Sequence, residues 1–310
     1  MIAHGAWLLA AAVAAPASTS AVGPGGGRVP SLDFAVIGDS RPPLPDDVAH
    51  YPVQVVSQIY REIDALSPRP QFVVSTGDYM FADASVPLAK SLAPRQADIY
   101  YRASRAFHGP LFLALGNHEC GNHVSSNCCP DCADGVTPNY QAFLALLGRL
   151  GLPHDEPYYT VHFASSDPSR PWTAKFVLLA PNAWDDAQAR WLGRALAEPT
   201  TYTFVVRHEP DYDDDACVGC APSDAIIKRF PYTLLLTGHE HTFRVVRASH
   251  ELVLGLGGAP LSTPADRPGY VVCTQRPDGA ISCQEHDMGS GSPGYADSSL
   301  TVTPDGKVVP

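Results

Sequence analysis

Five apolar runs in this chain each end in residues that can bind a metal ion or carry a proton. The run 111–115 leads through Gly116 directly into Asn117, His118 and Glu119. The corresponding residues after the other four runs are Asp39, Asp78, His208, and the pair His239 and His241. Carboxylate and imidazole ligands suit Zn, Fe or Mn. One such ending usually means a turn or a surface residue, but five in one chain predict a shared metal site.

The candidate ligands are Asp39, Asp78, Asn117, His208, His239 and His241. They are more than one tetrahedral metal ion needs. Two ions about 3.5–4 Å apart that share a bridging carboxylate would use them well. Such a pair clamps a phosphoryl group and produces hydroxide near neutral pH.

These residues need strands that bring them to one place. An unbroken apolar run is typical of a strand buried on both faces, and such strands end at the sheet edge where open α/β sheets bind ligands. The predicted strands are 34–37, 72–76, 111–115, 158–163, 175–179, 202–206, 233–236, 243–246, 252–256, 270–274 and 281–286. Helical spacing of apolar residues predicts helices over 53–66, 94–107, 140–150 and 185–197. Strands and helices alternate in the first part of the chain, and strands dominate afterwards. This order predicts an α/β fold: a two-sheet β-sandwich flanked by helices.

Net charge restricts the partners. The 310 residues carry a formal charge of −11. Non-specific nucleic-acid binding needs a basic face, so no nucleic-acid-binding surface is expected. An anionic substrate is repelled overall, and phosphate chemistry therefore requires a strong local positive centre, which a metal pair supplies.

The chain ends differ in composition from its middle. Residues 1–21 are predicted to be a signal peptide, because 7–15 is apolar but too short to span a bilayer. With no Lys or Arg before Trp7, an apolar tail or a mis-assigned start is the alternative. We expect a linker over 22–31, one domain over 32–287 and a flexible tail over 288–310. The mature protein is then secreted or periplasmic, without a membrane span.

Eight cysteines support export, because an even number in an exported chain indicates disulfides. Cys273 and Cys283 flank a turn at 277–279 and are predicted to pair across a hairpin. The other six lie in two inserts, 120–137 and 211–222, that follow motif strands and are expected to lie over the site as stapled loops. Their pairing stays open, and a zinc knuckle is the alternative.

The motifs resemble those of the calcineurin-like metallophosphoesterase superfamily over residues 33–262. The five blocks are Gly38-Asp39-Ser40-Arg41, Gly77-Asp78-Tyr79, Gly116-Asn117-His118-Glu119, Val205-Val206-Arg207-His208 and Gly238-His239-Glu240-His241. The third and fourth look most like the purple acid phosphatase branch. Secondary features that look similar are Gln188, Trp191-Leu192 and Gly257-Gly258-Ala259-Pro260. The resemblance implies a metallophosphoesterase-like α/β/β/α fold.

The same resemblance implies a role for each residue. Asp78 would bridge two divalent or trivalent metal ions. The other ligands would be Asn117, His208 and His239 on one side, and Asp39 and His241 on the other. His118 would protonate the leaving group or polarise the phosphate, and Glu119 would orient a neighbour.

The first block departs from the family at Arg41, where the family has a ligating His. A guanidinium has no lone pair for a metal. The Tyr ligand of the purple acid phosphatase branch is missing too, since Phe81 takes its place and Tyr79 would project differently. The first metal site is therefore expected to be weak or empty. Arg41 either grips a phosphate oxygen, replaces the first metal, or faces away in an ion pair.

The leading hypothesis is an exported metal-dependent phosphoesterase. It would hydrolyse small-molecule phosphate monoesters or diesters by attack of a metal-bound hydroxide, with His118 and Arg41 as catalytic residues. The alternative is a phosphate- or phosphoester-binding protein that kept the fold and lost turnover. A serine hydrolase has no support, since the chain has no Gly-x-Ser-x-Gly motif.

Overall fold

The computed structural model describes residues 22–128, 135–213, 215–289 and 299–309. The strands are β1 (Gly26–Val29), β2 (Asp33–Ile37), β3 (Phe72–Ser75), β4 (Leu111–Leu113), β5 (Tyr159–Ser165), β6 (Thr173–Leu178), β7 (Tyr202–Val206), β8 (Leu234–Thr237), β9 (Phe243–Val246), β10 (Glu251–Leu254), β11 (Gly269–Gln275), β12 (Ile281–Asp287), β13 (Ser299–Val302) and β14 (Val308–Val309). The helices are α1 (Val53–Ala65), α2 (Ala93–Ser104), α3 (Pro138–Arg149), α4 (Asp186–Ala197) and α5 (Cys220–Ile227), with the 3₁₀ turns η1 (Asn117–Glu119), η2 (Pro181–Ala183) and η3 (Arg247–Ser249).

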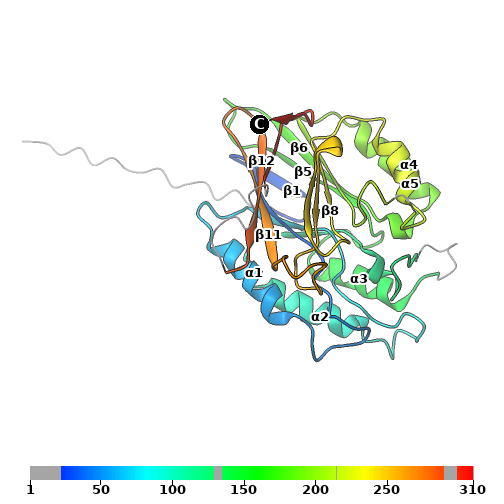
Figure 1. Cartoon of the computed structure of the whole chain (residues 1–310). Helices are drawn as coiled ribbons and strands as arrows, with labels where there is room; N and C mark the ends of the chain where they lie inside the picture. The colour runs from blue at the N-terminus through cyan, green and yellow to red at the C-terminus, as the bar shows by residue number, and fades with distance from the viewer. Residues whose placement is uncertain (1–21, 129–134, 214, 290–298, 310) are drawn as a thin grey trace, which may run out of the picture.

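These strands form two seven-stranded sheets, with the orders β1-β5-β6-β7-β8-β10-β9 and β14-β13-β12-β11-β2-β3-β4. Helices α1, α2 and α3 lie together on one side of the sheets, and α4 and α5 lie on the other (Figure 1). The predicted α/β fold with two sheets flanked by helices is therefore confirmed.

Aromatic side chains on the facing sides hold the two sheets together. Phe34 of β2 lies 5.1 Å from Phe176 of β6, measured between ring centroids. Phe72 of β3 stacks on Phe163 of β5 at 4.3 Å. All four are buried, and each large ring removes much apolar surface from water. This core fixes one sheet against the other.

Parallel pairing decides where the motifs meet. Strands β2, β3 and β4 are parallel neighbours in one sheet. Strands β7 and β8 are parallel neighbours in the other. Each set therefore ends at one sheet edge, and the aromatic core brings the two edges together.

Both predicted chain ends differ from expectation. Residues 299–302 and 308–309 were expected in a flexible tail, but they form β13 and β14, which extend the sheet beyond β12. Residues 26–29 were expected in the linker, but they form β1 and pair with β5. Strand pairing cannot be predicted from the composition of glycine-rich or short apolar segments, because the partner strand supplies the hydrogen bonds. The predicted signal peptide lies outside the described residues.

Candidate metal centre

The six predicted ligands lie together where the two sheet edges meet. Each lies two to four residues beyond the end of one of the strands β2, β3, β4, β7 and β8. The His239 backbone N–H donates to Asp39 Oδ2 at 3.1 Å, which joins the sheets. His208 Nε2 lies 3.4 Å from Asp78 Oδ1, also across the sheets. Asp39 and His208 are fully buried.

Three of the predicted ligands have an unusual backbone conformation. Asp39, Asp78 and His239 have φ angles of 59°, 61° and 69°, a region that non-glycine residues seldom occupy. Such conformations persist where the surrounding structure enforces them, and they are common at functional sites. The glycines nearby permit close approach: a Cβ on Gly116 would lie 2.4 Å from Asp78 Oδ1.

Asp39, Asp78 and His241 form one group, with ligand atoms all within 4.8 Å of one another. His241 Nδ1 donates to the Pro260 carbonyl oxygen at 2.6 Å, and its Nε2 lies 3.4 Å from Asp39 Oδ1. Burial alone would lower the pKa of His241, but the hydrogen bond and the charge of Asp39 outweigh it and raise that pKa. Asp39 Oδ1 is buried and also lies 4.0 Å from His208 Nε2.

Asn117, His208 and His239 form the second group. Asn117 Oδ1 lies 3.0 Å from His208 Nε2 and 3.1 Å from His239 Nδ1. His208 Nδ1 donates to the Thr76 carbonyl oxygen at 3.0 Å, which turns Nε2 toward the site. Oxygen and nitrogen atoms that can coordinate a cation thus converge.

The electrostatics of the centre suit a cation. Burial opposes a charge on His208, yet Asp78 and Asp39 raise its pKa well above the usual value. The same carboxylates would stabilise a metal ion beside this ring. With the buried Asp39 carboxylate and the N/O donor set, the residues present fit metal binding.

Arg41 points toward the centre. Its Nε lies 3.5 Å from Asp78 Oδ2, and its side chain is 13% exposed. Its guanidinium carbon lies 4.6 Å from the centroid of the Phe81 ring, a cation–π contact. Arg41 therefore forms an ion pair, as one alternative expected, but it faces the centre and not away from it. The packing of Phe81 against Arg41 was not foreseen, because no sequence pattern encodes a contact between two loops.

His118 lies beside the same residues. Its Nε2 is 3.8 Å from Asp78 Oδ2, and its ring centroid is 4.3 Å from that of Phe81. Its Nδ1 lies 3.1 Å from the Gly121 carbonyl oxygen and donates to it. Burial is the main reason that its pKa falls to about 4; Arg41 lowers it too, and Asp78 opposes the shift.

Glu119 holds the second block in place. Its buried carboxylate accepts from the backbone N–H groups of Gly116, Asp78 and Tyr79, at 2.7–2.8 Å. Burial, reinforced by the charge of Asp78, raises the pKa of Glu119 to about 8, while these hydrogen bonds oppose the shift. It contacts backbone rather than the open part of the centre.

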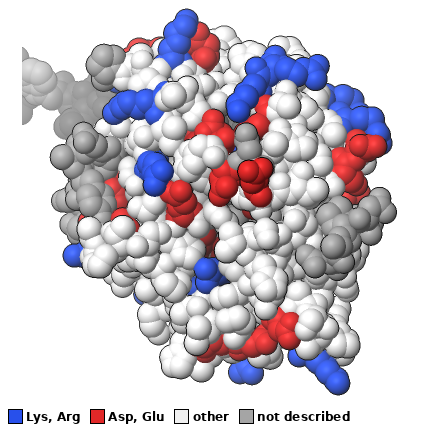
Figure 2. Space-filling view, turned by 45° about the vertical axis from the view of Figure 1, so that its right-hand side comes forward, with Lys and Arg blue, Asp and Glu red and all other residues white. Residues whose placement is uncertain are grey.

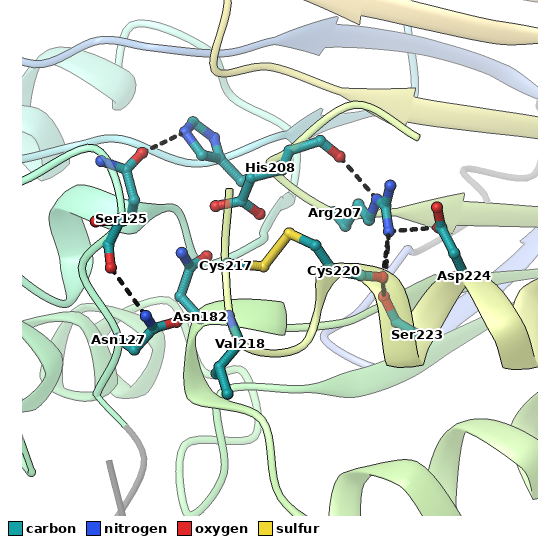
Figure 3. Close-up of a disulfide and its surroundings, with 12 residues drawn as sticks. Ser125, Asn127, Asn182, Arg207, His208, Cys217, Val218, Cys220, Ser223 and Asp224 are labelled. Carbon is teal, nitrogen blue, oxygen red and sulfur yellow. Dashed lines mark hydrogen bonds and ion pairs between the residues drawn. A yellow bond between two sulfur atoms is a disulfide. The ribbon is translucent and has the colours of Figure 1, made fainter. Parts of the chain in front are cut away.

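Disulfides staple both inserts beside the centre. Cys120 pairs with Cys128, and Cys217 pairs with Cys220. In Figure 3, Ser125, Asn127 and Asn182 lie on one side of the Cys217–Cys220 disulfide, and Arg207 and Asp224 lie on the other. The buried Arg207, next to His208, donates to Asp224 Oδ1 at 2.6 Å and so anchors α5, a helix that the sequence did not predict.

The cysteines of the described residues are all in disulfides. Cys273 and Cys283 pair across β11 and β12, as predicted. A zinc knuckle built from the described cysteines is therefore wrong, and this includes the group of Glu209, Cys217 and Cys220. The insert cysteines at 129 and 132 lie outside the described residues.

The secondary motif residues Pro260, Gln188 and Trp191 make different kinds of contact. Pro260 supplies the carbonyl that holds His241. Gln188 is buried and bonds both the N–H and the carbonyl of Ala180, so it fixes the chain after β6. Trp191 packs on Tyr158, with ring centroids 4.7 Å apart. On the face drawn in Figure 2, several Asp and Glu side chains lie near the middle, and Lys and Arg side chains lie mostly toward the rim.

Comparisons with known proteins agree with this architecture. Residues 33–243 match the profile of the family described as calcineurin-like phosphoesterase. The structure is similar to that of GAP50, the anchor in the inner membrane complex of Plasmodium, with a TM-score of 0.60, 16% identity, and 89% of this chain and 90% of that chain covered. It is similar to purple acid phosphatase PPD1 from yellow lupin (Lupinus luteus) seeds, with a TM-score of 0.60 and 13% identity over 89% of this chain and 54% of that one. No curated protein sequence matches significantly.

Proposed function

The chain belongs to the calcineurin-like phosphoesterase family, and we propose that it is an exported, metal-dependent hydrolase of small-molecule phosphate esters. The observation that carries the proposal is the convergence of Asp39, Asp78, Asn117, His208, His239 and His241. The donor set is of mixed oxygen and nitrogen type, which suits Zn, Fe or Mn. Metal ions bound there would neutralise charge on the phosphoryl oxygens and activate a water near neutral pH.

We assign the ligands to two ions. Asp78 lies between the groups, with Oδ1 near His208 and Oδ2 near Arg41. Asn117, His208 and His239 would be the other ligands of one ion, and Asp39 and His241 those of the other. The second ion would have few ligands and a guanidinium nearby, so it should bind more weakly.

Arg41 is proposed to hold the substrate. Its Nη1 donates to the Pro42 carbonyl at 3.1 Å, and its Nε faces Asp78. The contact with Phe81 fixes the plane of the guanidinium. The Nη2 group then remains to donate to a phosphate oxygen, as a charge-assisted hydrogen bond.

His118 is proposed to donate the proton to the leaving group. Its Nδ1 is held by Gly121, so its Nε2 is the atom available for proton transfer. Because its pKa is low in the free protein, a bound phosphate dianion must stabilise the protonated ring. This makes acid catalysis stronger at lower pH.

Export rests on the disulfides, which persist in oxidising compartments. Among the described residues, no helix is long and apolar enough to cross a membrane.

Hydrolysis of an aryl phosphate tests the assignment. Wild-type protein supplied with Zn²⁺ or Mn²⁺ should release the phenol. Asp78→Ala or His208→Ala should abolish this release, because each removes a ligand. Wild-type rates in either variant would refute the assigned centre.

A binding protein without turnover is the second candidate. The ion pair between Arg41 and Asp78 favours it, because it engages the oxygen that the bridging role needs. The similarity to GAP50, the anchor in the inner membrane complex of Plasmodium, is compatible with it. Saturable binding of inorganic phosphate, with no hydrolysis of any tested ester, would establish this candidate instead.

A further inference from the structure

The loop that follows the third motif contacts two residues of the centre. Asn117 Nδ2 donates to the His123 carbonyl oxygen at 3.0 Å. His118 Nδ1 donates to the Gly121 carbonyl oxygen at 3.1 Å. Both carbonyls belong to the loop closed by the Cys120–Cys128 disulfide.

These two contacts determine which atoms face the centre. An amide has an acceptor on one side and donors on the other. With Nδ2 held by His123, the Asn117 oxygen faces His208 and His239. A flipped amide would direct an NH₂ group at the cation site. In the same way, a bond at Nδ1 leaves the other nitrogen of His118 on the side of Asp78.

The loop has internal bonds that keep its carbonyls in position. The His123 N–H donates to Ser126 Oγ at 3.0 Å, and the Ser126 N–H donates back to the His123 oxygen at 3.2 Å. Ser126 is buried, whereas the neighbouring Ser125 is exposed.

Contacts with η2 and with the second insert hold the loop from outside. Asn182 of η2 donates through Nδ2 to the Ser126 carbonyl at 3.1 Å, and its backbone carbonyl accepts from the Cys128 N–H at 2.8 Å. The Val218 N–H donates to Asn127 Oδ1 at 3.0 Å, which connects the two inserts (Figure 3). Residues 120–128 form no helix or strand of their own. The disulfide and these few bonds therefore fix the loop.

We propose that the Cys120–Cys128 loop is a positioning element of the metal centre, which orients Asn117 as a ligand and His118 as a proton donor. The inference rests on the proposed metal-dependent function. Partners that orient metal ligands typically change metal affinity by about 10–100-fold when removed. We expect a loss of that size when the loop is released.

The main experiment compares two disulfides. Zn²⁺ affinity is measured for Cys120→Ser/Cys128→Ser and for the matched control Cys273→Ser/Cys283→Ser, whose disulfide lies across β11 and β12. Both variants lose a crosslink, so both are expected to melt at lower temperature. Only the first should bind Zn²⁺ about 10–100-fold more weakly. It should also lose more turnover with an alkyl phosphate than with an activated aryl phosphate, since only the former needs the proton from His118.

A milder pair of variants decides the matter if the double variant does not fold. Ser126→Ala removes the acceptor of the His123 N–H, and the exposed Ser125→Ala changes the same loop without that loss. Weaker Zn²⁺ binding by Ser126→Ala alone supports the proposal.

Equal Zn²⁺ affinity in Ser126→Ala and Ser125→Ala, or in the two disulfide variants, would overturn the positioning role. That result differs from failure of the proposed function, in which wild-type protein itself neither binds Zn²⁺ nor hydrolyses esters.

Discussion

Replacing Arg41 separates the ways in which this side chain can act. Its Nε lies 3.5 Å from Asp78 Oδ2 and the side chain is 13% exposed. Two unit charges at that separation interact by about 1 kcal/mol in water and by roughly 5 kcal/mol at an effective dielectric constant of 20. Since 1.4 kcal/mol is tenfold in an equilibrium constant, loss of the guanidinium should strengthen metal binding at Asp78 by about one to three powers of ten.

The variant Arg41→Met removes the charge and keeps an apolar contact with Phe81. We expect tighter metal binding by the group of Asp39, Asp78 and His241, and a lower kcat/KM. A hydrogen bond to a charged group contributes about 1.5–3 kcal/mol, so kcat/KM for an aryl phosphate should fall roughly 10–150-fold. Arg41→His removes the charge and adds a possible ligand, so it should bind metal more tightly than Arg41→Met.

The assay combines a Zn²⁺ titration with aryl phosphate kinetics on the same preparations. Arg61→Met, at an exposed position of α1, is the matched control. If Arg41→Met leaves both metal affinity and kcat/KM as they are in Arg61→Met, Arg41 has no role at the centre and the reasoning fails.

Two further predictions concern the residues beside Arg41. Because the pKa of His118 in the free protein is about 4 and the proton donor must be protonated, the factor by which wild-type protein exceeds His118→Gln in kcat/KM for an alkyl phosphate should fall as pH rises from 4 toward 7. A factor that stays constant over this range would exclude His118 as the acid. Phe81→Leu removes a ring that contacts both Arg41 and His118, and a cation–π contact contributes about 0.5–2 kcal/mol, so kcat/KM should fall roughly 3–30-fold. Wild-type kcat/KM in Phe81→Leu would rule out a contribution of this ring.

The sequence predicts the part of the centre that local pattern encodes. A buried strand that is followed by Gly and a ligand can be recognised in the sequence, because a continuous apolar run needs burial on both faces. Strand β7 has the predicted bounds 202–206, and β2 begins one residue before the predicted 34–37. Parallel pairing then makes Asp39, Asp78 and Asn117 neighbours.

What the sequence does not predict depends on contacts between distant segments. The direction of Arg41 is decided by the ring of Phe81 and by Asp78 in another loop. The positive φ angles of Asp39, Asp78 and His239 are imposed by surrounding packing. The tail strand β13 is short, and its pairing with β12 and β14 makes it a strand.

The most direct test of the account is the number of metal ions per chain, measured by elemental analysis of protein purified from an exporting host without chelator. We expect close to two ions per wild-type chain, and a clear loss in Asp78→Ala, since that residue contributes to both positions. Close to one ion in the wild-type chain would contradict the two-metal assignment and indicate that Arg41 takes the place of the weaker ion. No bound ion, and no uptake from added Zn²⁺ or Mn²⁺, would contradict the metal centre itself.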